Sequence, residues 1–216
     1  MIPSEALKIN EIFYSLQGES LTSGIPTLFI RLTGCPLRCR YCDTEYAFSE
    51  GKWVTINDII KHTEESKADY VTVTGGEPLA QKRCLNLLHR LCDTGYLVSL
   101  ETSGAHDISA VDKRVTIVMD IKTPGSGEAK RNRYANISQL DAKDQVKFVI
   151  CDRKDYDWAK SLLQEHALHQ KCNVLFSPAW EKQNAGKLAE WILTDGLPVR
   201  MQLQLHKILW GDIRGR

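Results

Sequence analysis

The chain has 216 residues, 43% of them hydrophobic and 25% charged, a composition typical of a globular protein. This length fits one large domain, taken here as residues 1–216, and falls short of the roughly 250 residues of a complete eight-fold βα barrel. With 28 Lys and Arg against 27 Asp and Glu, the formal net charge is +1, which argues against DNA or RNA as the main partner.

Membrane and secretion signals are not expected from the sequence. No stretch approaches the ~18 apolar residues that a membrane span needs. The start, Met1 to Glu5, lacks the basic and then apolar pattern of a signal peptide. We therefore expect a cytoplasmic protein without a membrane partner. There are seven cysteines. In a reducing compartment, clustered cysteines are better interpreted as metal ligands or redox groups than as disulfides.

Short apolar runs alternate with helical patterns along the chain. Runs rich in Val, Ile, Leu and Phe predict strands at 27–32, 70–74, 97–100, 115–121, 146–150, 173–176 and 199–205. Apolar residues at helical spacing lie between them, at 56–60, 85–92, 158–163 and 188–192. Thr55 with Asp58 predicts a helix start, and Gly95 a helix end. This alternation predicts an α/β fold with a parallel sheet, a partial TIM-like βα barrel of about six parallel strands.

Polar motifs follow several of these strands. They are Thr74 to Pro78, Glu101 to Gly104, Asp120 to Lys122, Ser177-Pro178 and His206-Lys207. Because ligand sites of parallel βα folds lie at the carboxyl ends of the strands, we expect these motifs to meet at one rim. Gln17, Gly18 and Glu19, before the first predicted strand, form either a polar turn or part of that site.

Three of the seven cysteines lie within eight residues. Cys35, Cys39 and Cys42 form the pattern C-x3-C-x2-C in the loop 34–44. Three thiolates on so short a loop suit an iron–sulfur cluster that keeps one iron open, or a structural zinc completed by a distant Cys or His. The other four cysteines, 84, 92, 151 and 172, are interpreted as small core residues.

The cysteine loop and the turn Gly75-Gly76-Glu77-Pro78 together resemble those of radical S-adenosylmethionine (SAM) enzymes, as does Tyr41 just before the last cysteine. The resemblance implies a 4Fe–4S cluster whose open iron binds the amino and carboxyl groups of SAM. Reductive cleavage of SAM then supplies a 5′-deoxyadenosyl radical, so no protein residue is expected to carry the radical.

A closer resemblance is to the 7-carboxy-7-deazaguanine synthase family. It rests on segments 11–20, 29–32, 42–44, 100–104, 120–124 and 205–207, nearly the whole chain. The resemblance implies a lyase that converts 6-carboxy-5,6,7,8-tetrahydropterin to 7-carboxy-7-deazaguanine with loss of ammonia, on the route to queuosine. It also implies assistance by Mg²⁺.

The same resemblance implies the site residues. Those expected to bind the pterin substrate are Leu16, Gln17, Gly18, Glu19, Arg31, Thr74 and His206. Those expected to bind SAM are Tyr41, Cys42, Asp43, Gly76, Glu77, Glu101, Ser103, Asp120, Ile121 and Lys122. The expected metal ligands are Cys35, Cys39 and Cys42 for the cluster and Thr44 for Mg²⁺. Structural alternatives stay open: an ion pair for Arg31, local salt bridges for Glu101 and Lys122, a helix cap for Thr44 and a core position for His206.

Two other functions fit part of the sequence. A glycyl-radical-enzyme activating protein would share the cysteine spacing and the Gly-Gly-Glu-Pro turn. A zinc-binding or iron–sulfur carrier module without catalysis would share the cysteines alone. Segment 16–19, Arg31 and Thr44 favour the synthase. The resemblance further implies a flavodoxin or ferredoxin-type electron donor and a homodimer.

Overall fold

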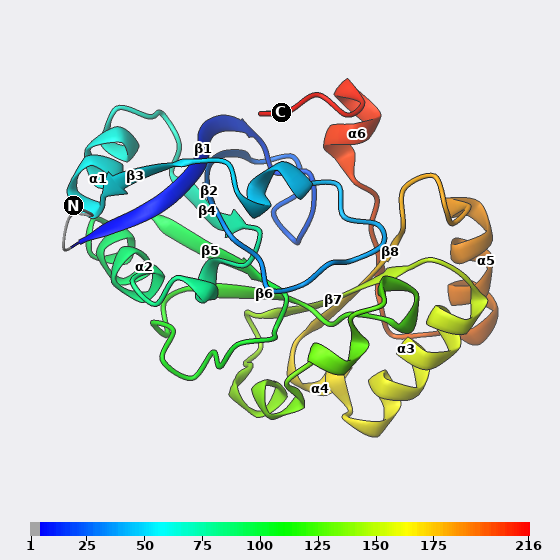
Figure 1. The fold of residues 1–216 in the computed structure, drawn as a ribbon. Helices are drawn as coiled ribbons and strands as arrows, with labels where there is room; N and C mark the ends of the chain where they lie inside the picture. The colour runs from blue at the N-terminus through cyan, green and yellow to red at the C-terminus, as the bar shows by residue number, and fades with distance from the viewer. Residues whose placement is uncertain (1–4) are drawn as a thin grey trace.

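One curved sheet of nine strands organises residues 5–216, which are the residues that the computed structural model describes (Figure 1). The strand order is β3-β1-β2-β4-β5-β6-β7-β8-β9. From β2 to β9 every neighbouring pair runs parallel, and no pairing joins β3 to β9. The sheet is therefore an open, partial barrel, as predicted. The strands are β1 (Ala6–Leu16), β2 (Pro26–Leu32), β3 (Lys52–Thr55), β4 (Tyr70–Gly75), β5 (Leu97–Thr102), β6 (Thr116–Asp120), β7 (Gln145–Ile150), β8 (Asn173–Pro178) and β9 (Arg200–Met201).

Two antiparallel strands at one edge, β1 and β3, were not predicted from the sequence. β1 pairs with β2 on one side and with β3 on the other. Its register shifts between Ile9 and Glu11, where a β-bulge changes which face the side chains meet. The bulge interrupts the two-residue alternation that reveals a strand in a sequence. Gln17, Gly18 and Glu19, for which a polar turn was one interpretation, follow the end of β1 at Leu16 and lie outside the strands.

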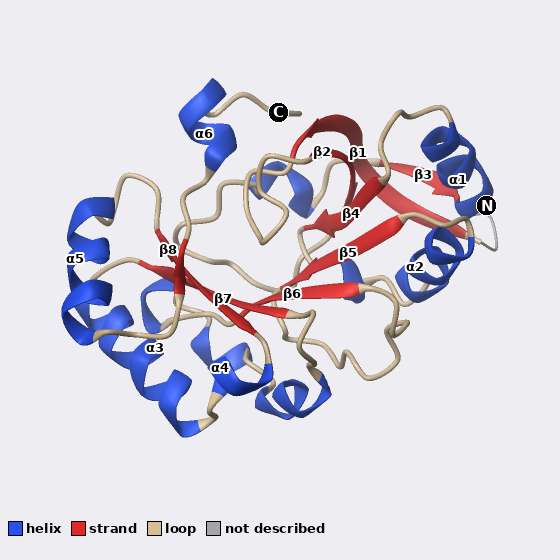
Figure 2. Cartoon of the chain, turned by 180° about the vertical axis from the view of Figure 1, so that it is seen from behind, coloured by secondary structure: helices blue, strands red, loops and turns tan. Residues whose placement is uncertain are grey.

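Helices cover the sheet where apolar stripes predicted them (Figure 2). Thr55 caps the first one, with its hydroxyl accepting from the Asp58 N–H at 3.1 Å. The next ends before Gly95, whose φ of +92° an L side chain would resist. Both views place α1 beside β3 and α2 beside β5, and α3, α4 and α5 beside β7 and β8. The helices are α1 (Ile56–Glu64), α2 (Cys84–Asp93), α3 (Arg153–Glu165), α4 (Leu168–Lys171), α5 (Ala185–Asp195) and α6 (Leu205–Trp210).

The strand predicted at 199–205 is wrong beyond its first residues. Only Arg200–Met201 pairs with β8, and the chain then leaves the sheet. Gln202 continues the contact through its N–H to the Phe176 carbonyl, and its side-chain amide donates to the Ser20 carbonyl at 3.0 Å. His206 therefore lies in α6 and does not end a strand. In Figure 1, α6 stands apart from the other helices, next to the carboxyl terminus.

The four cysteines outside the loop 34–44 divide into two environments. Cys84, Cys92 and Cys172 are buried in the core, as predicted. Cys151 is only partly buried, and burial raises the pKa of its thiol to about 12. Among the helices of residues 5–216, none has both the length and the apolar character required to cross a bilayer. Met1 to Ser4, on which part of the signal-peptide expectation rests, lie outside the described residues.

Candidate active site

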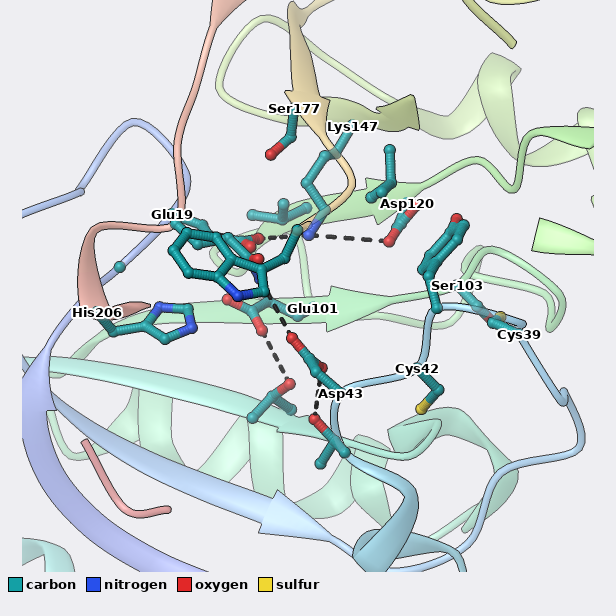
Figure 3. Close-up of a pocket in the computed structure, with 18 of the residues that line it drawn as sticks. Glu19, Cys39, Cys42, Asp43, Glu101, Ser103, Asp120, Lys147, Ser177 and His206 are labelled. Carbon is teal, nitrogen blue, oxygen red and sulfur yellow. Dashed lines mark hydrogen bonds and ion pairs between the residues drawn. The ribbon is translucent and has the colours of Figure 1, made fainter. Parts of the chain in front are cut away.

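A cavity of about 430 Å³ lies at the carboxyl ends of the parallel strands, the edge where the sequence predicted a site (Figure 3). Most of the predicted site residues line it. They are Leu16, Gln17, Gly18, Glu19, Arg31, Cys35, Cys39, Tyr41, Cys42, Asp43, Thr44, Thr74, Gly76, Glu101, Ser103, Asp120, Lys122 and His206. Glu77 and Ile121 are not among its lining residues: both side chains are buried, and Ile121 belongs to the hydrophobic core.

The cysteine loop is held against the end of β4 by backbone bonds. The Glu77 N–H donates to the Gly34 carbonyl at 2.8 Å, and the Gly76 N–H donates to the Leu32 carbonyl at 3.1 Å. A Cβ at Gly76 would overlap the Gly34 carbonyl and stand 2.8 Å from the Cys35 Cβ. The glycine is therefore required for the close approach of turn and cysteine loop.

The three thiols of this loop share one wall of the cavity. Each is partly buried, and burial raises the pKa of Cys35 and Cys42, and that of Cys39 to about 11. Lys122 opposes that rise at all three thiols. Three thiols without a fourth protein ligand in the loop fit a four-iron cluster that keeps one iron for another ligand. The thiols must lose their protons when such a cluster binds.

The Glu77 carboxylate holds together the turn after β4 and the end of β5. It accepts from the Leu79 N–H at 3.0 Å, the Thr102 hydroxyl at 2.9 Å and the Ser103 N–H at 2.7 Å. The side chain is fully buried, with four donor groups of the protein around it once the Ser103 hydroxyl is included. A ligand in the cavity would thus meet Gly76 and Ser103, whereas the Glu77 carboxylate ties the turn to β5.

Gln17 and Glu101 connect the loop after β1 to the sheet. The Gln17 amide donates to Thr72 at 3.2 Å and to Glu101 at 3.3 Å, while its oxygen accepts from the Glu19 N–H at 3.1 Å. Glu101 also accepts from the Thr74 hydroxyl at 2.9 Å. These bonds engage the Gln17 side chain, which is 3% exposed, and fix Glu19 at the edge of the cavity.

A network of charges crosses the middle of the cavity. Lys122 donates to Asp120 at 2.8 Å. This is the local salt bridge that the sequence analysis gives as the structural alternative for Lys122. Burial opposes the charge of Lys122, but Asp120 outweighs it and raises the pKa of the amine. The second oxygen of Asp120, Oδ1, is buried without a hydrogen-bond partner among the described residues. It is an acceptor open to a ligand.

Lys147 completes this network and was missed by the sequence analysis. It stands on β7, donates to Glu19 and lies 3.8 Å from Asp120 (Figure 3). A lysine flanked by fully buried Val146 and Phe148 is the signal that the sequence offered. An amine between two buried apolar residues needs partners from elsewhere.

Arg31 takes the ion pair that was its structural alternative and also lines the cavity. Its Nε donates to Glu11 at 2.7 Å, and the Tyr46 hydroxyl donates to the same carboxylate oxygen at 3.0 Å. The outer oxygen of Glu11 meets Arg214 at 3.2 Å. Because only the Nε of Arg31 is engaged by Glu11, its terminal nitrogens remain for an anionic ligand.

Helix α6 closes the cavity from the side of the carboxyl terminus. Its first N–H, that of Leu205, donates to the Gly18 carbonyl at 2.9 Å, and His206 lies so close to Gly18 that any Cβ there would overlap the imidazole. Lys207 reaches Asp43 at 3.3 Å. Arg216, in the segment after the helix, also lines the cavity.

Asp43 joins α6 to the cysteine loop. Burial alone would raise the pKa of this carboxyl, but Lys207 and hydrogen bonds from Thr44 and Gln204 outweigh it and lower the pKa to about 2. The Thr44 hydroxyl donates to Asp43 at 2.9 Å and also lines the cavity, so its oxygen lone pairs stay available.

Comparisons with known proteins show the family and the fold of this chain. Residues 29–163 match the Radical SAM superfamily. A 7-carboxy-7-deazaguanine synthase of Chlorobaculum tepidum is 46% identical over 213 residues, which are 97% of each chain. That of Koribacter versatilis is 41% identical, over 94% of this chain and 97% of its own. The crystal structure of QueE from Escherichia coli superposes with a TM-score of 0.76 at 23% identity, over 93% of this chain and 95% of its own, and so supports the fold. The chain belongs to the 7-carboxy-7-deazaguanine synthase family of the radical SAM superfamily.

Proposed function

We propose that this protein is a 7-carboxy-7-deazaguanine synthase, which contracts the ring of 6-carboxy-5,6,7,8-tetrahydropterin with loss of ammonia, in queuosine biosynthesis. One observation carries the proposal: the cysteine loop, the Gly-Gly-Glu-Pro turn and the loop 16–19 border a single cavity. The names of the relatives at 41–46% identity support it. Nothing in the site favours a glycyl-radical-enzyme activating protein.

Membership of the radical SAM superfamily implies a 4Fe–4S cluster and SAM. When bound, the pair supplies a carbon-centred radical that abstracts a hydrogen atom from the substrate. Cys35, Cys39 and Cys42 would hold the cluster. The open Oδ1 of Asp120 and the Ser103 hydroxyl suit the amino group or ribose of SAM. Apart from Glu77 and Ile121, the residues expected to bind SAM line the same cavity as the three thiols.

The substrate would occupy the part of the cavity between Arg31 and α6. Arg31 offers terminal guanidinium nitrogens to the substrate carboxylate. Glu19 offers a carboxylate to the amino group of the pterin ring. Leu16, Gly18, Thr74 and His206 border the same space, and Gln17 acts by holding Glu19 in place.

Magnesium is proposed at Thr44, with the substrate supplying further oxygen ligands. The Thr44 hydroxyl lines the cavity beside the Asp43 carboxylate. Hard oxygen donors of this kind suit Mg²⁺, which retains several waters and seldom has an all-protein cage. The chain itself would then provide one ligand and a neighbouring negative charge.

The remaining partners follow from the chemistry. A 4Fe–4S cluster held by the three cysteines would need an electron from outside the chain, and we propose a flavodoxin or ferredoxin-type donor. Seven free thiols among the described residues suit a reducing compartment, and we propose the cytoplasm. A homodimer is proposed from the family resemblance.

The experiment is an anaerobic incubation of the reconstituted protein with dithionite, SAM, Mg²⁺ and carboxytetrahydropterin. Mass spectrometry is expected to detect 7-carboxy-7-deazaguanine in amounts well above the enzyme concentration. A protein that carries its cluster and cleaves SAM but forms no such product would refute the proposed function.

A further inference from the structure

Lys147 occupies a place in the cavity that the proposed function has not yet used. Its side chain is 15% exposed and that of its partner Glu19 is 14% exposed. Replacing a buried ion pair by apolar residues often leaves a protein equally stable or more so, so stability alone does not account for this one. The pair faces the cavity, not the packed core (Figure 3).

β7 holds the loop after β1 at two points. Gln145 and Lys147 are two residues apart, so their side chains leave the same face of the strand. The Gln145 amide oxygen accepts from the Leu21 N–H at 2.9 Å, and Lys147 donates to the Glu19 carboxylate. Ser20, between these contacts, has a φ of +66°, a conformation that a serine seldom adopts unless its neighbours impose it.

Only one oxygen of Glu19 is engaged. Lys147 contacts Oε2, and Oε1 accepts no hydrogen bond from the residues that the structure describes. On its other side, Lys147 lies 3.8 Å from Asp120, whose Oδ1 is also open. One ammonium therefore stands between two carboxylates that each present a free acceptor.

We propose that Lys147 is a positioning residue, which joins the substrate-side Glu19 to the cofactor-side Asp120 and holds the Glu19 side chain in place as an acceptor for a 2-aminopyrimidine ring. This inference rests on the proposed function, because the pterin is what would carry that ring. The ring presents N–H donors at its amino group and at the adjacent nitrogen, and an ionised carboxylate accepts from both.

The charges around Lys147 agree with this role. Burial opposes its ammonium, but Glu19, Asp120 and Glu101 outweigh burial and raise its pKa. The amine thus stays charged at any pH at which the enzyme works. Its positive charge compensates one of the three carboxylate charges of Glu19, Asp120 and Glu101, all of which line the cavity.

The test compares Lys147→Met and Lys147→Arg with Lys154→Met, a matched control on the exposed part of α3. For Lys147→Met, the KM for carboxytetrahydropterin is expected to rise about 100-fold, because Glu19 loses its partner. The KM for SAM should change little, because Asp120 keeps its closer ion pair with Lys122 at 2.8 Å. Lys147→Arg should restore most of the loss. The control should match the wild type.

A second measurement separates positioning from structure. An analogue with an oxo group in place of the 2-amino group lacks one of the two donors that Glu19 would accept from. The wild type should strongly prefer the amino compound, and Lys147→Met should lose most of this preference. A structural role alone would lower turnover of both compounds equally and leave their ratio unchanged.

A double variant keeps the test open if Lys147→Met folds poorly. Lys147→Met combined with Glu19→Gln leaves no unpaired charge of this pair, and the two changes should be far from additive in pterin KM. Additive effects, an unchanged pterin KM or an equal rise in the KM for SAM would overturn the proposal. Absence of product from the wild type would instead refute the proposed function, since the Lys147 comparison concerns ratios to the wild type.

Discussion

Individual residues at the strand ends determine how closely the walls of the cavity approach. Gly76 allows the turn after β4 to touch the cysteine loop, and Gly18 leaves room for His206. Glu77 binds four donor groups within the turn and the end of β5. The motif Gly-Gly-Glu-Pro therefore connects the cysteine loop to the end of β5. This connection determines the position of the residues that face a ligand.

Gly76→Ala is expected to separate the turn from the cysteine loop. The added Cβ overlaps the Gly34 carbonyl and the Cys35 side chain, and overpacking of this kind costs about 1–3 kcal/mol. Iron and sulfide per chain after reconstitution should fall together with the absorbance of the cluster. Gly186→Ala, in helix α5, is the control and should bind iron normally. A Gly76→Ala protein with full iron content would contradict the contact.

Thr44→Val tests the proposed magnesium site at nearly constant volume. The valine lacks the hydroxyl oxygen, so the Mg²⁺ concentration for half-maximal rate should rise about tenfold or more, which corresponds to about 1.4 kcal/mol. Thr116→Val, at the start of β6, should leave this concentration unchanged. An equal Mg²⁺ requirement in both variants would place the ion elsewhere.

The sequence alone identified those site residues whose chemistry depends on their own type and spacing. The three cysteines and the polar motifs after β4, β5 and β6 are of this kind, and all of these segments border the cavity. Lys147 could not be assigned in this way because its role depends on Glu19, which is 128 residues away in the chain. The hydrogen bonds of the Gln17 side chain could not be predicted either, because its partners Thr72 and Glu101 lie on β4 and β5.

At the scale of elements, the parallel strands were predictable because both of their faces are covered. Their apolar runs are continuous, and helices of matching period follow them. β1 was not predictable, since its bulge breaks the alternation and its partners are β2 and β3. α6 was missed because Val199 to Leu205 alternates like a strand, whereas β8 pairs with only two of these residues.

Helices α3 and α5 are joined by a polar contact that responds to pH. Asp195, at the end of α5, accepts from Lys160 at 2.8 Å and from the Tyr156 hydroxyl at 2.7 Å. Hydrogen bonds from these two residues lower the pKa of the Asp195 carboxyl. The contact therefore adds stability above the ordinary carboxyl pKa of about 3.9, and this stability is lost as the pH falls below that value.

Asp195→Asn should accordingly lower the free energy of unfolding at pH 7 and have a much smaller effect at pH 3. Urea unfolding of the cluster-free protein at the two pH values measures this difference. Glu190→Gln, on the exposed side of the same helix, should have a small effect at both. An Asp195→Asn effect that is equal at pH 7 and pH 3 would exclude a role for the carboxylate charge.

For the whole molecule, the open sheet explains how a short chain encloses a cavity. No strand pairing joins β3 to β9 within residues 5–216, so the cavity is bordered instead by the loop after β1, by α6 and by the segment that ends at Arg216. Arg214 fastens that segment through Glu50 at 2.9 Å and stacks over the Tyr46 ring at 4.1 Å. Three short segments thus take the place of the missing barrel strands.

The charge of the whole molecule leads to a last prediction. A net charge of +1 leaves little attraction for a polyanion, and its one basic run, 130–133, is partly neutralised because Arg133 pairs with Asp107 at 3.2 Å. The cation proposed to meet an anionic ligand, Arg31, stands inside the cavity. The protein should therefore show no shift of transfer RNA in a gel at about 0.15 M salt, where binding through phosphate contacts weakens steeply with salt. A salt-dependent shift that Lys130→Glu abolishes would contradict this prediction and assign the basic run to nucleic acid.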